Sequence, residues 1–135
     1  MTATPSRYER GKALMDRILG PEDASTVLDG FNAISPDFGN YVVEAGFADI
    51  YGRDGLSLPE RQLLNIAILT ALGGAEPQLA LHMRAALNVG VSPTQIIESV
   101  IHTALYAGHP RAVNGLRVAS EVLAQAQHVS EDGSR

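Results

Sequence analysis

The stretch at 72–90, LGGAEPQLALHMRAALNVG, decides the fold because it contains the end of one helix, a turn and the start of another. The glycine pair at 73–74 predicts the helix end, since glycine takes the left-handed C-terminal conformation without steric cost. Glu76 and Pro77 suit the first turn of the next helix, where the dipole stabilises a carboxylate and no backbone donor is needed. We expect that helix to extend to about Asn88.

His82 lies on the apolar face of this expected helix. Leu79, Met83 and Ala86 recur at helical spacing and form a stripe that includes His82. A buried imidazole needs hydrogen-bond partners, and its pKa lies close enough to neutrality for its surroundings to change its charge at physiological pH. Two interpretations stay open: a hydrogen-bonded core histidine, or an acid–base group with a function.

Composition narrows the function classes. The chain of 135 residues has no cysteine, which excludes disulfides, thiolate zinc sites and cysteine nucleophiles. The net charge of −5, with basic residues scattered singly, argues against a nucleic-acid partner. The four histidines form no HxH, HxxxH or HExxH pair, so no metal site is expected. Without a secretory or membrane-spanning apolar run, we expect a cytoplasmic protein.

The periodicity predicts an all-α fold, because helix spacings and caps recur and no alternating run of strand length appears. We expect six or so helices in a single domain at 8–126, after a polar segment at 1–7 and before a disordered polar tail at 127–135. The expected helices are 8–19, 21–34, 36–52, 58–72, 76–88, 93–107 and one that starts at Pro110. In the third of these, Phe38, Tyr41, Val42 and Ala45 are expected to face the core.

The expected helix at 93–107 has a second stripe of interest. Glu98, His102 and Tyr106 recur at intervals of four residues. They are interpreted either as a solvated face or as the lining of a pocket. The chain is also 45% hydrophobic, with apolar runs such as LLNIAILTAL. This exceeds what one small bundle can bury and predicts a homo-oligomer.

These residues resemble the carboxymuconolactone decarboxylase family from Tyr8 to about Leu123. The similarity includes SPDFGNYVVEAGFADIYGRDGL at 35–56 and, at 58–116, a helix ending in ALG, then PQLxxH, ALNxG and YAGxP. The resemblance implies an all-helical bundle like that of alkylhydroperoxidase D, assembled as trimers or hexamers with pockets near subunit interfaces. It also implies that His82 matches the histidine of the family's active-site pattern.

Two departures from the family pattern qualify what the resemblance implies. The peroxidase branch needs two cysteines where this chain has Ala75 and Gln78, so thiol-based reduction of peroxides is excluded. The other branch typically has Arg-Glu-Leu where this chain has Arg-Gln-Leu, so Gln62 replaces a carboxylate that relays protons. As a further difference, His102 stands where many relatives have glutamine, which suggests that the acid–base group has moved.

The leading hypothesis is therefore a cofactor-independent lyase, resembling 4-carboxymuconolactone decarboxylases of aromatic catabolism and acting on a small carboxylated lactone or related enolisable acid. Such a reaction needs an acid–base group, for which His82 and His102 are the candidates. Gln62 and Tyr106 are candidates to bind the enolate oxygen, and Arg84 and Arg111 to attract the anionic substrate. Neither a metal nor a nucleotide is required. The alternative is a non-catalytic oligomeric ligand-binding or scaffold protein that has lost the proton relay at Gln62.

Overall fold

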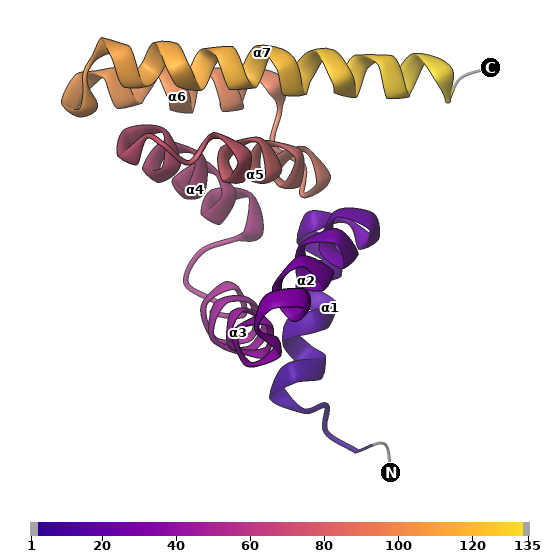
Figure 1. The fold of residues 1–135 in the computed structure, drawn as a ribbon. Coiled ribbons are helices and arrows are strands. Elements are labelled where there is room, and N and C mark those ends of the chain that lie inside the picture. Colours follow the sequence, from indigo (N-terminus) through magenta and orange to yellow (C-terminus); the bar gives the residue numbers. More distant parts are fainter. Residues whose placement is uncertain (1–2, 134–135) are drawn as a thin grey trace. The chain divides into compact units, whose positions relative to one another are not determined.

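A computed structural model describes residues 3–133, which are all-helical and contain no strand (Figure 1). The element bounds are α1 (Arg7–Leu19), α2 (Pro21–Ile34), α3 (Pro36–Tyr41), the π-helix η1 (Val42–Tyr51), α4 (Leu58–Leu72), α5 (Glu76–Asn88), α6 (Pro93–Ala107) and α7 (His109–Asp132). Two compact units, 1–58 and 59–135, make up the chain, and the single domain expected at 8–126 stays a prediction. Each unit has buried residues of its own.

The unit at 1–58 is built from α1, α2, α3 and η1, with α1 packed along η1. Its buried apolar side chains come from α1, α2 and η1: Met15, Ile18, Leu19, Ala24, Leu28, Val43 and Phe47. The close approach of α1 to η1 depends on Gly11, where an added Cβ would lie 2.2 Å from the Val43 carbonyl oxygen. A glycine is required there because any side chain would push the two helices apart.

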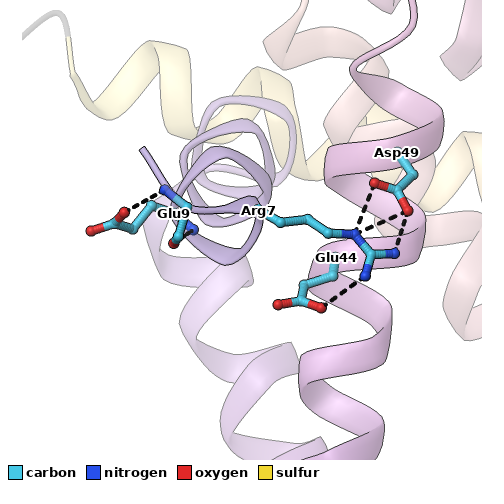
Figure 2. Close-up of polar contacts among 5 residues, drawn as sticks. Arg7, Glu9, Glu44 and Asp49 are labelled. Carbon is cyan, nitrogen blue, oxygen red and sulfur yellow. Dashed lines mark hydrogen bonds and ion pairs between the residues drawn. The ribbon is translucent and has the colours of Figure 1, made fainter. Parts of the chain in front are cut away.

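A surface ion-pair cluster also links α1 to η1 (Figure 2). The Arg7 guanidinium donates from Nε to both Asp49 oxygens, at 3.0 and 3.1 Å, and from Nη1 to Glu44 Oε2 at 3.1 Å. The hydrogen bond from Arg7 lowers the pKa of the Asp49 carboxyl. Because these side chains are exposed, solvent screens the pairs, and they orient the helix more than they stabilise it.

The register of η1 differs from the expected one. Phe38 and Tyr41 are 49% and 64% exposed, although both were expected in the core, whereas Gly39, Val43 and Phe47 are buried. The prediction assumed an α-helix throughout 36–52. Phe38 and Tyr41 lie in the α-helical part, α3, and a ten-residue π-helix follows from Val42. The buried positions Gly39, Val43 and Phe47 are four residues apart, so a different face of the segment is buried from the one expected.

The unit at 59–135 contains α4 to α7, and α7 packs against both α5 and α6. In Figure 1, α6 and α7 lie side by side as a hairpin joined through Gly108. The core takes residues from all four helices: Ile66, Leu79, Met83, Ala86, Val91, Ile96, Val100, Ala119 and Val122. Gly115 lets α7 approach this core, since an added Cβ would lie 2.8 Å from side-chain atoms of Thr70 and Val100.

The helix ends in this unit agree with the sequence prediction. Gly73 and Gly74 have φ values of 68° and 72°, the left-handed conformation expected after α4. Ser92 and Gln95 form a reciprocal capping box at the start of α6.

The C-terminal segment differs from the disordered tail expected at 127–135. Helix α7 continues to Asp132, and residues 134–135 lie outside the described part of the chain. No glycine or proline occurs between Gly115 and Gly133, and the Ser130 hydroxyl donates to the Gln127 carbonyl at 2.8 Å. Polarity alone predicted disorder here, but polar side chains on one face are compatible with a solvated helix.

Candidate functional site

Helix α5 holds His82 at the boundary between core and surface. Its neighbours on the same face, Leu79, Met83 and Ala86, are buried in the core of the unit, and the His82 side chain is itself partly buried. The helix begins at Glu76 and Pro77, as the sequence predicted. The apolar stripe therefore fixes the rotation of α5 and brings the imidazole towards α4.

Two amide side chains of α4 meet the His82 ring. Gln62 Oε1 lies 3.0 Å from His82 Nδ1, and Asn65 Nδ2 lies 3.3 Å from Gln62 Oε1 and 3.4 Å from His82 Nδ1. Gln62 is fully buried, with no exposed surface. The structure thus brings together two residues that the sequence selected, His82 and Gln62, and adds Asn65.

Burial sets the charge of this histidine. Loss of solvation lowers the pKa of His82 from its ordinary 6.5 to about 4, because the charged imidazolium is disfavoured away from water. The side chains on Nδ1 are neutral amides, which provide no negative charge to offset this loss. His82 is consequently neutral at physiological pH in the free protein.

The nitrogen of Gln62 has unused hydrogen-bonding capacity. Within residues 3–133, Gln62 Nε2 is buried and has no hydrogen-bond partner, although its oxygen faces His82 and Asn65. A buried N–H group without an acceptor costs about 1–3 kcal/mol. Such a group next to an imidazole is suited to bind an oxygen atom of a ligand.

His102 and Tyr106 lie on the exposed face of α6. His102 borders an open groove of about 380 Å³ together with Glu98, His109 and apolar side chains of α6. Among the described residues no ion pair joins Glu98 to His102, and Tyr106 is 98% exposed. The interpretation as a solvated face therefore applies to Tyr106, while His102 and Glu98 line a groove. Within residues 3–133, no hydrogen bond or ion pair joins His102 to Gln62 or His82.

The two candidate arginines occupy separate places. Arg84, two residues after His82 on α5, lines a groove with Asn88 and Val122. The Arg111 guanidinium lies over Gly73, at the end of α4, where an added Cβ would meet Nη1 at 1.6 Å.

Asn65 is the site residue that sequence reasoning missed. It follows Gln62 by three residues on the same helix, a spacing that places both amides on one face. The signal was therefore available as a pair of amides in LPERQLLNIAIL, but the prediction selected only Gln62 and treated LLNIAILTAL, which contains Asn65, as an apolar run.

The chain is similar in sequence to a known family and to several known proteins. The model of the carboxymuconolactone decarboxylase family matches residues 36–121. The chain is 34% identical to a 4-carboxymuconolactone decarboxylase of Acinetobacter baylyi, over 86% of each chain. It is 26% identical to a nitrosuccinic acid decarboxylase of Metarhizium robertsii, over 86% of this chain and 80% of the relative. An uncharacterised 15.0 kDa protein of Paracoccus denitrificans is 33% identical over 62% of this chain and 63% of its own.

These relatives support a decarboxylase-like enzyme, in agreement with the resemblance found in the sequence. In addition, none of the helices described at 3–133 is long and apolar enough to cross a membrane.

Proposed function

The chain belongs to the carboxymuconolactone decarboxylase family, and from this premise we propose that it decarboxylates a small acid by proton transfer at His82. The substrates named in the two decarboxylase relatives are both carboxylic acids with an electron-withdrawing group, a lactone in one and a nitro group in the other. Both groups accept electrons onto oxygen when CO2 leaves. We therefore propose a substrate whose carboxylate is conjugated to such an acceptor, with a carboxylated lactone as the first choice.

The observation that carries the proposal is the contact between His82 and Gln62, at 3.0 Å in a partly buried place. In the reaction, the bond from carbon to the carboxylate breaks and its electron pair passes to the acceptor oxygen. The Gln62 N–H groups, which have no hydrogen-bond acceptor in the described structure, are suited to stabilise that oxyanion. His82 then delivers a proton to carbon, so that each turnover releases CO2 and consumes one proton.

Proton delivery requires that His82 become charged during the cycle. With a pKa of about 4 the free protein holds little imidazolium at neutral pH. An anionic substrate beside the ring favours the charged form and raises this pKa. Binding of the anionic substrate therefore favours protonation of His82, and the reaction later uses this proton.

Substitution of His82 by glutamine tests the proposal. Glutamine keeps hydrogen-bonding capacity but cannot transfer a proton near neutral pH, so turnover of a carboxylated lactone should fall by about a hundredfold or more. The melting temperature should change little. His128→Gln, an exposed position on α7, is the matched control and should keep full activity. An unchanged rate in His82→Gln would exclude the catalytic role.

His102→Gln tests whether the second histidine shares this role. The exposed groove that His102 borders is separate from the amide contacts of His82. We propose that His102 assists only in binding, so this substitution should raise KM and leave kcat nearly unchanged. A loss of kcat comparable to that of His82→Gln would assign the acid–base step to His102 instead.

The neutral amide at 62 favours one alternative function, a ligand-binding protein without catalysis. A screen of carboxylated lactones and nitro acids, with calorimetry for binding and CO2 release for turnover, separates the two. Binding without CO2 release would support the alternative.

A further inference from the structure

We propose that Asn65 is a positioning residue that fixes the orientation of the Gln62 amide and thereby selects the tautomer of His82 with its proton on Nδ1. The tautomer can be measured without a substrate, and only the expected effect on turnover rests on the proposed function. It follows from three atoms: Asn65 Nδ2, Gln62 Oε1 and His82 Nδ1.

The first step concerns what each atom can do. An amide nitrogen only donates and an amide oxygen only accepts. Gln62 Oε1 lies 3.0 Å from His82 Nδ1, so Nδ1 must carry the hydrogen in that contact. The same oxygen accepts from Asn65 Nδ2 at 3.3 Å. Asn65 Nδ2 also lies 3.4 Å from His82 Nδ1, because both nitrogens converge on this oxygen, and the two shorter contacts assign both as donors to it. One oxygen therefore receives two donors, and both point to the same orientation of the Gln62 amide.

The second step concerns the opposite orientation. A half-turn of the Gln62 amide would place Nε2 where Oε1 now lies, facing both Asn65 Nδ2 and His82 Nδ1. Two donors, Nε2 and Asn65 Nδ2, would then oppose each other. Without Asn65, a rotated Gln62 could donate to Nδ1, and the ring proton would move to Nε2. Asn65 thus favours the observed orientation of the Gln62 amide over the rotated one.

In this arrangement the two nitrogens of the His82 ring have different roles. With Nδ1 donating to Gln62, the lone pair of His82 Nε2 is available to take up and deliver the proton. The same orientation leaves the Gln62 N–H groups without a partner in the described structure, available to a ligand oxygen. Both reactive atoms therefore depend on the side chain at 65, which itself need not touch the substrate.

Nuclear magnetic resonance of the full-length chain with labelled histidine tests the inference. At neutral pH the nitrogen and carbon shifts of the ring distinguish the two tautomers. We expect His82 of the unmodified protein to show a single Nδ1–H form. In Asn65→Leu, which is similar in size and has no donor, a second set of signals from the Nε2–H form should appear. Asn65→Ala should behave in the same way if the leucine variant fails to fold.

Asn40→Asp, at an exposed position of α3, is a control that should leave the His82 signals unchanged. An Nε2–H form in the unmodified protein would overturn the inference, as would an unaltered tautomer in both folded Asn65 variants. Turnover gives the separate readout for the proposed function: kcat should fall in parallel with the loss of the Nδ1–H form. A tautomer shift without any measurable turnover in the unmodified protein would support the positioning role and contradict the decarboxylase proposal.

Discussion

At the scale of single residues, position 62 places a neutral amide beside an imidazole whose charge is set by burial. Gln62→Glu would place a carboxylate within reach of His82 Nδ1, which now lies 3.0 Å from the Gln62 oxygen. An opposite charge at this distance should raise the pKa of His82 by at least about one unit, as measured by resonance titration. The carboxylate would also repel the oxyanion that Gln62 is proposed to bind, so turnover should fall. A gain in turnover would contradict the oxyanion role of the amide.

The depressed pKa of His82 also predicts how stability depends on pH. Folding lowers this pKa from 6.5 to about 4, so between these values the unfolded chain binds more protons than the folded chain. His82 therefore contributes up to about 3 kcal/mol to the free energy of unfolding. This contribution is complete above pH 6.5 and is lost as the pH falls towards 4.

Urea unfolding of the unmodified protein and of His82→Gln at pH 5 and pH 7 measures this effect. The difference in free energy of unfolding between the two proteins should change with pH, since the other titrating groups are common to both. A difference that stays constant would show that His82 does not titrate in that range.

His82 and Gln62 could be predicted from the sequence because each breaks a pattern: a histidine within an apolar stripe, and an amide where the family has a carboxylate. Asn65 could not be singled out in this way, since an asparagine on a helix surface is unremarkable until its donor is seen 3.3 Å from Gln62 Oε1. Arg84, Arg111 and Tyr106 were chosen for charge or hydrogen-bonding capacity alone, and sequence spacing gave no information on where they meet a ligand.

At the scale of elements, the contact between α1 and η1 depends on the absence of a side chain at Gly11. Gly11→Ala should destabilise the protein, because its Cβ would lie 2.2 Å from the Val43 carbonyl oxygen and the backbone would have to move. Gly30→Ala on α2 is the matched control. A Cβ there meets nothing within 4 Å, so the change should be neutral or stabilising by up to about 1 kcal/mol. Equal melting temperatures for the two variants would contradict the close-packing argument.

The helix bounds were largely predictable because their signals are local. Ser92 with Gln95, the glycine pair at 73–74 and the prolines at helix starts each act on the neighbouring backbone. The register of η1 was not predictable by the same means. Which face of this segment is buried depends on its packing against α1, so Tyr41 is exposed and Phe47 is buried although helical spacing alone pointed to Tyr41.

At the scale of the whole molecule, we predict a homo-oligomer, a trimer or hexamer. Leu64, Ile68 and Leu72 recur at intervals of four on α4 and are 48%, 54% and 64% exposed. An apolar stripe of this kind is stabilised when another surface covers it. Analytical ultracentrifugation should give a mass of three or six 14.3 kDa chains at micromolar concentration.

Ile68→Lys should weaken this association, and Ser120→Lys, at an exposed polar position of α7, should not. A stable 14.3 kDa monomer of the unmodified protein would refute the prediction.

The short distance along the chain between Gln62 and His82 has a consequence for folding kinetics. The two residues are 20 positions apart, in consecutive helices of one unit. The entropy lost in closing a loop grows slowly, by about 0.6 kcal/mol for each doubling of its length, and short-range contacts form quickly. After a transient opening, the imidazole and its amides should therefore regain their contacts among the earliest events of refolding.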